Sequence, residues 1–388
     1  MKKRTLSLLV LLAMMLTLLA GCSGGNSTAS SGSANNGSSN AGKAASSAGA
    51  TGKKLKVSLL VTGSFGDKAF NDSAQAGMQK IKESLGDKCD VKMTEMGSDK
   101  TKFESSLQDA SESDADVIIT GTWDMKEIME KVAPQYPDKK YIIFDTDVDY
   151  KSADLSNVYS MSYKQNEAAF LAGVLAANVT TSNMKYANKN AVIGFVGAKD
   201  TAAVINDSVV GYIEGAQFVN PKTKVLVSYV GSYTDSAKAK ELALTQYSSG
   251  ADCVFVAAGP ASVGVIEAGT ESQKYVIGVD SDQALAYKGQ KEANYIISSA
   301  IKGVGTTIYN SVQKSLDGKL PYGKYEQLGL KEDAVGLADN DIYKSTVPES
   351  IRTKVDDAKK QLLDGKVKLD TAYGMDKNKL KQIISSAQ

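Results

Sequence analysis

Short β-branched runs alternate with segments of helical period along this chain, and no other feature constrains its fold as strongly. One series starts at Leu55 and a second starts at Ala191. Their strand-like runs are KVSLLV, DVIITG and YIIFDT in the first series, and AVIGFVG, KVLVSYVG, DCVFVAAG and YVIGVD in the second. Such alternation predicts βαβ units around a parallel sheet. The repetition predicts two similar α/β lobes.

Polar clusters follow several of these strand-like runs directly. Ligands of open α/β sheets bind outside the carboxyl ends of the strands, where the βα turns converge. We therefore expect the clusters to line one cleft between two lobes that can close over a small molecule. The clusters are GSFGDKAFND, TGTWD, FDTDVD, GAKDTAAVIND, AAGPASVG and GVDSDQ.

An Asn-Asp-Ser run occurs in the same place in both series, in FNDSAQAG and in INDSVVGYIEG. If the two are equivalent, Asn71 and Asn206 lie at helix N-termini on facing lobes, where the uncapped backbone favours polar groups. A match of three residues is also compatible with chance.

Composition excludes several classes of function. The 388 residues are 42% hydrophobic, enough for the cores of two domains. Lys and Arg total 45 against 44 for Asp and Glu, so charge provides no reason to expect a nucleic-acid partner. Histidine is absent, which removes the commonest general base and the commonest zinc ligand. We expect no catalytic residues, no metal site and no cofactor, and for Cys89 and Cys253 the role of small buried side chains.

The N-terminal residues predict export and lipid attachment. Residues 1–21 join a basic start to an apolar segment, as in a secretion signal, and LAGC at residues 19–22 is similar to the lipobox of bacterial lipoproteins. That resemblance implies cleavage before Cys22 and a lipid on its side chain. The alternative is an uncleaved anchor helix with an incidental cysteine. Residues 22–54 are rich in Ser, Gly, Asn and Ala and predict a flexible tether. We expect a lipid-anchored protein on the extracytoplasmic face of a cell membrane, at the surface of a Gram-positive bacterium.

From Leu55 to Gln388 the chain resembles the BMP (basic membrane protein) family of substrate-binding lipoproteins, which includes purine nucleoside receptors of bacterial ABC importers. The resemblance rests on GDKAFNDSAQAG, NEAAFLAGVLAA, GAQFVNP, YVGSYTDSAKAKELALTQYSSGADCVFVAAG and GVDSDQ. It implies an α/β fold of the type I periplasmic-binding-protein class, with two Rossmann-like lobes of parallel strands joined by a three-crossover hinge. The expected first lobe is 55–162 plus about 298–325, and the second is 163–297 plus about 326–388. We expect a monomer.

The resemblance also assigns ligand contacts at the first turn. It makes Asp67 and Asn71 hydrogen-bonding partners of a nucleobase and Phe70 a ring that stacks on it. This suits the chemistry, because a purine edge carries donors and acceptors and a flat ring gains about 1–3 kcal/mol from stacking on an aromatic side chain. The alternative is an N-capped helix whose Phe70 enters the core and whose Lys68 is solvated.

A second set of implied contacts lies at later strand ends. Asp145 matches an acidic ligand contact, and Asp280 and Lys302 match the groups that hold the ribose hydroxyls. Those hydroxyls are donors, so carboxylates suit them.

The sequence departs from the family pattern at the base. Ser208 stands where nucleoside-binding members have a second aromatic ring, and Trp123 is a candidate replacement, although a tryptophan at a strand end also serves packing. The loop that begins with Gly259 reads GPAS, and Pro260 removes an N–H that could face the ligand. A pyrimidine nucleoside, a modified base or another polar metabolite is therefore also compatible. Nucleotides are disfavoured because Arg352 is the only arginine after the tether.

The expected function is that of an ABC importer substrate-binding protein that delivers a nucleoside, with a purine favoured, to a membrane permease. A hydrolase is disfavoured because Ser262 lacks the G-x-S-x-G spacing and a histidine. Asp280 and Asp282 form a D-x-D pair that could hold a cation, yet such pairs are common in solvated turns. The alternative function is a surface sensor or receptor of the same fold for another small polar metabolite, without transport.

Overall fold

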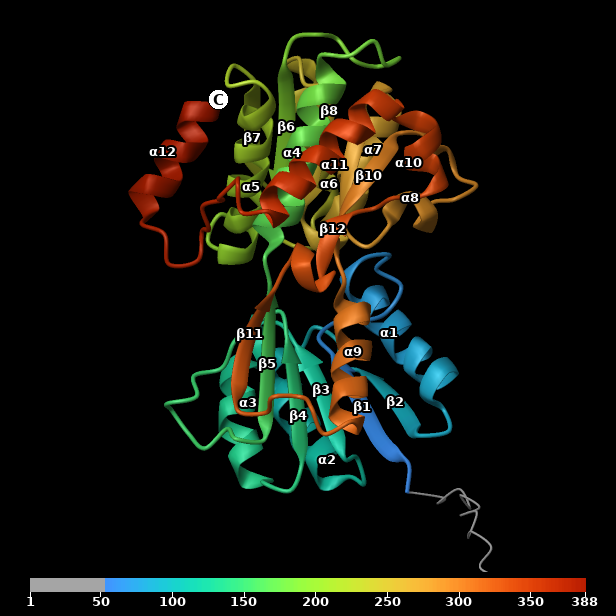
Figure 1. Ribbon diagram of the computed structural model, residues 1–388, viewed down its shortest axis with the longest axis vertical. Coiled ribbons are helices and arrows are strands. Elements are labelled where there is room, and N and C mark those ends of the chain that lie inside the picture. Colours follow the sequence, from blue (N-terminus) through green and yellow to red (C-terminus); the bar gives the residue numbers. More distant parts are fainter. Residues whose placement is uncertain (1–52) are drawn as a thin grey trace, which may run out of the picture. The chain divides into compact units, whose positions relative to one another are not determined.

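Two six-stranded sheets organise the part of the chain that the computed structural model describes, residues 53–388 (Figure 1). The first sheet has the strand order β11-β5-β4-β3-β1-β2, and all of its strand pairs are parallel. Its strands are β1 (Leu55–Val61), β2 (Cys89–Glu95), β3 (Val117–Gly121), β4 (Lys140–Phe144), β5 (Val158–Tyr163) and β11 (Lys324–Leu328).

The second sheet repeats this arrangement with the order β12-β10-β9-β8-β6-β7. Its pairs are parallel except at one edge, where β12 runs antiparallel to β10. Its strands are β6 (Val192–Gly197), β7 (Lys224–Tyr229), β8 (Cys253–Ala257), β9 (Tyr275–Asp280), β10 (Ile296–Lys302) and β12 (Val335–Leu337).

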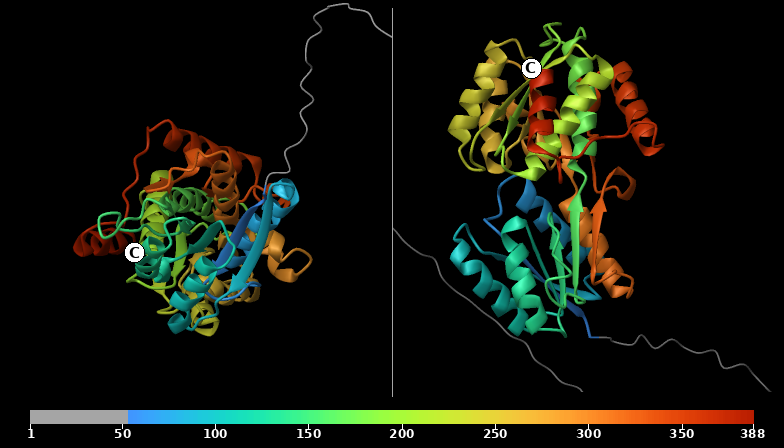
Figure 2. Two further views of the ribbon diagram at one scale, coloured as in Figure 1. Left: turned by 90° about the horizontal axis from the view of Figure 1, so that it is seen from below. Right: turned by 90° about the vertical axis from the view of Figure 1, so that its left-hand side faces the viewer.

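Helices lie on both faces of each sheet (Figure 1, Figure 2). The first lobe has α1 (Phe70–Leu85), α2 (Phe103–Glu112), α3 (Lys126–Val132) and α9 (Val304–Leu316). The second lobe has α4 (Gln165–Thr180), α5 (Ala203–Val219), α6 (Ser236–Ser248), α7 (Ser262–Ser272), α8 (Gln283–Ala286), α10 (Asp341–Thr346), α11 (Glu349–Leu363) and α12 (Lys377–Ala387). The prediction of two α/β lobes built on parallel sheets is confirmed, with antiparallel β12 as the exception.

The chain passes between the two sheets three times. It does so between β5 and α4, between β10 and α9, and between β11 and β12. The limits of about 298 and 325 expected from the sequence fall inside β10 and β11, because β10 belongs to the second sheet up to Lys302 and β11 to the first up to Leu328. These passages bring strand ends of both sheets close to one another.

Helix α4 contains the segment NEAAFLAGVLAANV, which is apolar on every side because the helix is buried. Fifteen of its sixteen residues are buried, so it needs no polar face. It packs closely on α5, because Gly211 and Gly215 leave room for its backbone: a β-carbon at Gly215 would overlap the carbonyl oxygen of Phe170. Helix α1 meets α9 in the same way, at Gly77 and Gly305. Each lobe therefore contains helices whose close spacing depends on glycine.

The predictions for residues 1–52, namely the signal peptide, the lipidated Cys22 and most of the tether, lie outside the described residues. Within residues 53–388, no helix combines the length and the apolar character that crossing a bilayer requires. Cys89 and Cys253 are free thiols and both are buried, as expected for small packing side chains.

Gly215→Ala should lower the free energy of unfolding by about 1–3 kcal/mol, because the new methyl group must push α4 away from α5. Chemical denaturation measures this. Gly336→Ala is the matched control, because a β-carbon there meets only a Leu330 methyl group at 3.9 Å, and its effect should stay within about 0.5 kcal/mol. Equal losses in the two variants would contradict the close helix packing.

Candidate functional site

Three ionisable side chains from the two sheets meet at the carboxyl ends of their strands. Lys302 ends β10, Asp280 ends β9 and Asp145 follows β4. The Lys302 Nζ donates to Asp145 Oδ1 at 2.9 Å and lies 3.9 Å from Asp280 Oδ1. Their side chains are only 10–15% exposed. We call these three residues the ion triad, and it links the first sheet to the second.

Burial affects the pKa values of Asp280 and Lys302 in opposite directions. It raises the pKa of Asp280 to about 6, an effect that Lys302 opposes and that the charges of Asp145 and Asp67 reinforce. Burial lowers the pKa of Lys302, but Asp145 and Asp280 raise it by more, so the net shift is upward. Lys302 therefore keeps its charge, and Asp280 is the member that titrates just below neutral pH.

The backbone is strained at two members of the ion triad. Asp145 has φ 60° and Asp280 has φ 65°, in the left-handed region that L-residues rarely adopt. Lys68 and Thr122, which follow other strands of the first sheet, also have positive φ. Such strain persists where surrounding contacts impose it, and it is typical of binding sites.

Aromatic rings lie beside the ion triad. The Lys302 Nζ lies 5.4 Å from the ring centroid of Phe70 and 5.7 Å from that of Tyr163. The Phe70 ring is half-buried and lies 5.6 Å from the ring of Phe144, at an interplanar angle of 40°. Phe70 therefore both packs against the core and borders the charged cluster.

Asp67 and Asn71 organise the turn before α1. Asp67 Oδ2 accepts from the Asn71 N–H at 2.8 Å, and Oδ1 accepts from the N–H groups of Ala69 and Asp72 at 2.9 and 3.1 Å. These bonds satisfy N–H groups that the start of a helix leaves unpaired. The Asn71 Nδ2 donates to two carbonyl oxygens of the preceding loop, at 3.1 and 3.2 Å. The structure therefore gives both residues a role in building the turn.

The same turn touches the second lobe. The carbonyl oxygen of Lys68 accepts from Ser281 Oγ at 2.6 Å, and its Nζ lies 4.1 Å from the ring centroid of Tyr287. Lys68 is thus a contact between the lobes. Sequence reasoning considered it only as a solvated side chain, and the one signal available was its place in the turn.

Within residues 53–388, three further predicted site residues make no hydrogen bond or ion pair with the ion triad. Trp123 is 69% exposed, with Lys126 Nζ 4.9 Å from its ring. Ser208 is buried in α5, and its hydroxyl donates to the Val204 carbonyl oxygen. Gly259 has φ +56°, a conformation that suits glycine.

Tyr233 is a residue near the ion triad that the sequence analysis missed. It packs over Gly259, where a β-carbon would lie 3.5 Å from the Tyr233 Cδ1. Burial raises its pKa, Lys302 opposes this shift, and the carboxylates of Asp145 and Asp280 add to it. The phenol therefore lies within electrostatic reach of the ion triad. Its only sequence signal was an aromatic residue in the loop after a predicted strand.

Asp282 has a structural role. Its Oδ1 accepts from the Leu285 N–H at the start of α8, and both its oxygens accept from Asn340 Nδ2 at 2.8 Å. Within residues 53–388 there is no cluster of three or more His, Cys, Asp or Glu side chains suited to a metal ion.

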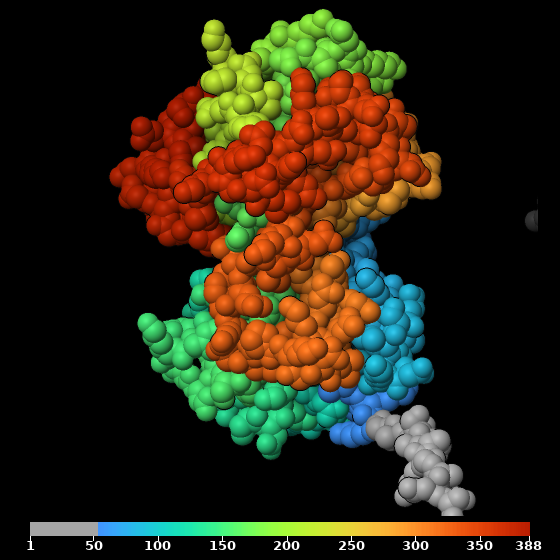
Figure 3. All heavy atoms as spheres, in the orientation of Figure 1, coloured from blue at the N-terminus to red at the C-terminus, as the bar shows by residue number. Residues whose placement is uncertain are grey.

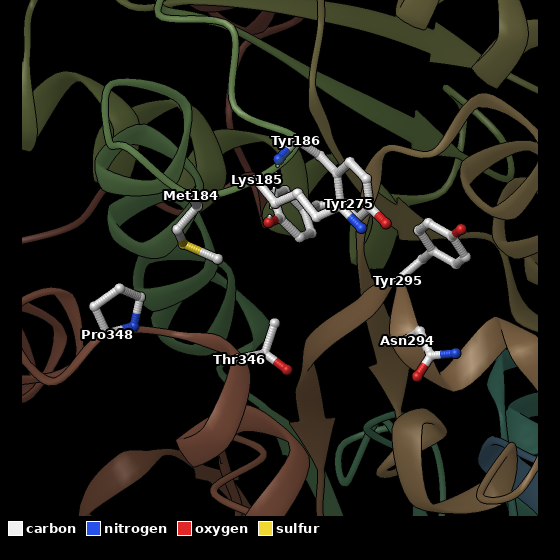
Figure 4. A pocket seen from close by; sticks show the side chains of 8 residues that line it. All are labelled: Met184, Lys185, Tyr186, Tyr275, Asn294, Tyr295, Thr346 and Pro348. Atoms are coloured by element: carbon white, nitrogen blue, oxygen red, sulfur yellow. Dashed lines mark hydrogen bonds between the residues drawn. The ribbon is translucent and has the colours of Figure 1, made fainter.

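A separate hollow of about 570 Å³ opens near the amino end of β9, away from the ion triad (Figure 4). Tyr186 lies 5.4 Å from Tyr275 and 5.5 Å from Tyr295, measured between ring centroids, and Lys185 Nζ lies 4.8 Å from the Tyr186 ring. These rings hold one another in place and anchor the loop between α4 and β6. The hollow is lined by Met184, Lys185, Tyr186, Tyr275, Asn294, Tyr295, Thr346 and Pro348.

Comparison with known proteins agrees with this fold. The model of the Bmp family, described as ABC transporter substrate-binding protein PnrA-like, matches residues 54–364. "ABC transporter nucleoside-binding protein BmpA" of Lactococcus lactis subsp. cremoris (strain MG1363) is 32% identical over 339 residues, which cover 82% of this chain and 91% of the relative. "Basic membrane protein D" of Borreliella burgdorferi (strain JD1) is 32% identical over 296 residues, covering 76% and 81%.

Among solved structures, an ABC transporter solute-binding protein from Aeropyrum pernix K1 superposes with a TM-score of 0.73 at 25% identity, covering 86% of this chain and 97% of that one. The resemblance found in the sequence is thus confirmed by a family match over most of the chain and by the fold. The chain belongs to the Bmp family of ABC transporter substrate-binding proteins.

Proposed function

We propose that this protein is a lipid-anchored extracytoplasmic receptor that binds a nucleoside, preferentially a purine nucleoside, and delivers it to an ABC permease. Family membership itself assigns a small-molecule ligand, a permease partner and a place outside the cytoplasm at the membrane. The family binds substrates and is not catalytic. The nucleoside and the lipid on Cys22 are the proposed parts.

The ion triad is the observation that carries the proposal. Two carboxylates accept hydrogen bonds from ribose hydroxyls, and the Lys302 ammonium donates to a ribose oxygen. Phe70 borders this cluster with a flat ring that suits a nucleobase. One ammonium and two carboxylates leave a net charge of −1 when Asp280 is ionised. That charge disfavours a phosphate and supports a nucleoside over a nucleotide.

The residues that contact the base are proposed from their match to the family pattern in the sequence. We propose that Asp67 and Asn71 present their remaining acceptor capacity to the base edge, with Gly259 close to the ligand. Ser208 supplies no aromatic platform, so the second face of the base falls to Trp123 or Tyr233. The L. lactis relative, whose printed name is nucleoside-binding, supports a nucleoside as the ligand class.

The lipid anchor and the tether rest on the sequence of residues 1–54. A lipid on Cys22 followed by residues 22–54 would hold the receptor near the membrane while leaving its lobes free to meet the permease. We propose that it acts as a monomer. Loss of membrane association after Cys22→Ala would support the anchor, whereas retention at the membrane would argue for an uncleaved helix.

Inosine should stabilise the full-length protein in detergent. A ligand that binds only the folded state adds about 2.7 kcal/mol when present at one hundred times its Kd. A thermal-shift screen with inosine, adenosine, uridine, hypoxanthine and D-ribose measures this. Shifts with the purine nucleosides support the proposal. A shift with D-ribose or another sugar alone would point instead to a receptor of the same fold for a different metabolite.

Asp280→Ala should weaken inosine binding by about 1.5–3 kcal/mol, because it removes a charge-assisted hydrogen bond to a ribose hydroxyl. Isothermal titration calorimetry measures the Kd, and circular dichroism checks that the variant folds. Asp282→Asn is the matched control, two residues away and bonded to Asn340, and it should bind like the wild type. Unchanged affinity in Asp280→Ala would remove Asp280 from the ligand site.

Inosine affinity should fall as the pH drops through 6. The pKa of Asp280 is raised to about 6, so the carboxylate that accepts from the ligand is about nine-tenths protonated at pH 5, and Kd should rise up to about tenfold between pH 7.5 and pH 5. Titrations across this range test it. Asp280→Asn should abolish the pH dependence, and a flat wild-type profile would contradict the assignment.

A further inference from the structure

The chain continues past the part that the family model matches. That match ends at residue 364, and residues 365–388 comprise a loop and helix α12. Helix α12 packs against α5 and β7, and this C-terminal segment, coloured dark red, lies on the surface of the second lobe (Figure 3). The segment is therefore joined to the helix that carries the second Asn-Asp-Ser run.

Four residues of this segment, Asp370–Tyr373, are bonded to the start of α4 and to α5, and we call them the C-terminal clip. Asp207, the acid of the second Asn-Asp-Ser run, is fully buried. Its Oδ1 accepts from Thr371 Oγ1 at 2.6 Å and from the Ala372 N–H at 2.9 Å, while Oδ2 accepts from the Asn166 N–H at 3.1 Å. One buried carboxylate thus ties the clip to both helices.

A second set of contacts fixes the beginning of the clip. The Asp370 N–H donates to both oxygens of Glu214 at 3.2 Å, and the Asp370 carbonyl oxygen accepts from Asn166 Nδ2 at 2.9 Å. Lys379 of α12 pairs with the Asp370 carboxylate at 2.8 Å. These bonds hold the backbone of the clip in place. They thereby fix the direction of the side chain of its last residue, Tyr373.

The side chain of Tyr373 reaches the hinge, the place where the chain passes between the two sheets. Its hydroxyl oxygen accepts from Gln165 Nε2 at 2.7 Å. Gln165 begins α4, two residues after Tyr163 ends β5, at one of the three passages between the sheets. Gln165 is 7% exposed, and its buried Oε1 has no donor within residues 53–388. A buried acceptor without a donor is costly, which marks this end of α4 as a place for a further polar group.

Tyr373 also lies near the ion triad, because it bonds to Gln165, and the ring of Tyr163, two residues before Gln165, has its centroid 5.7 Å from Lys302 Nζ. Burial is the main cause that raises its pKa, and the negative charges of Asp145 and Asp207 come next. The phenol is thus neutral at physiological pH. Because its oxygen already accepts from Gln165, its proton is free to donate to another acceptor. Tyr373 as a whole residue remains 39% exposed, so it is not sealed off from solvent.

We propose that Tyr373, positioned by the C-terminal clip and oriented by Gln165, donates a hydrogen bond to the bound ligand and helps to determine its specificity. This inference rests on the proposed function, since it places the phenol beside the nucleoside site. A neutral phenol donor suits a ribose or carbonyl oxygen. A segment outside the matched family domain then completes the cleft at its hinge side.

Tyr373→Phe removes the proton and keeps the ring. In the full-length protein in detergent, Kd for inosine should rise about five- to tenfold, the usual effect of one lost hydrogen bond. The melting temperature of the ligand-free protein should fall slightly, because Gln165 Nε2 loses its acceptor, but the rise in Kd should appear at temperatures where the variant is fully folded. Tyr136→Phe is the matched control, because its hydroxyl bonds to Glu112 on the surface of the first lobe, and its Kd should equal that of the wild type.

Derivatives of inosine identify the acceptor. Both proteins are titrated with 2′-, 3′- and 5′-deoxyinosine and with purine riboside, which lacks the base carbonyl group. One of these derivatives should bind equally to the wild type and to Tyr373→Phe. That derivative lacks the acceptor of the tyrosine proton, so neither protein can form the hydrogen bond with it. Equal Kd values of the two proteins for inosine itself would overturn the inference and leave the proposed function standing. A fall in the melting temperature of ligand-free Tyr373→Phe with no change in Kd would show a structural role alone and would also overturn it.

If none of the nucleosides binds either protein, the proposed function fails. The inference is then tested on the small molecules that remain bound to each protein when it is purified from the cell. Mass spectrometry identifies and quantifies the small molecules that each protein releases when it is denatured. Less compound retained by Tyr373→Phe than by the wild type and Tyr136→Phe supports the contact. Equal retention in all three, or none in any, overturns it.

Discussion

The pairing of Lys302 with Asp145 is the interaction on which the site depends. It joins the end of a strand in the second sheet to the end of a strand in the first, at 2.9 Å and nearly out of solvent. A buried ion pair returns little net stability, because both charges lose their hydration. Its value here is electrostatic, because it holds an ammonium and two carboxylates together in a buried place. Burial there raises the pKa of Asp280 to about 6, against the opposing charge of Lys302.

The two Asn-Asp-Ser runs show how one local pattern acquires two roles. In the first lobe, Asp72 accepts from the N–H groups of Gly66 and Lys68 and shapes the turn that touches the second lobe. In the second lobe, Asp207 occupies the equivalent place but accepts from Thr371 and the residue after it. The difference arises because the C-terminal segment packs against α5 of the second lobe and brings distant donors to that carboxylate.

Local physics made much of the architecture predictable. Alternating strand and helix periods in two series indicated two parallel α/β lobes, and polar clusters after the strands indicated the edge where Asp145, Asp280 and Lys302 meet. Tyr233 and Tyr373 were not predictable in this way. An aromatic residue in a loop carries no periodic signal, and Tyr373 reaches Gln165 across 208 positions of sequence.

The sequence by itself determined the fold class, the absence of histidine chemistry and the strand ends that carry the acidic groups, because each depends on residue type and local spacing. Tertiary structure alone decided what those groups do. Asp280, at the end of its strand, is buried beside Lys302 and Asp145, and burial raises its pKa to about 6. Lys302 becomes the centre of the site because the chain passes between the sheets directly after it. Burial and long-range contact, which no local pattern encodes, set these roles.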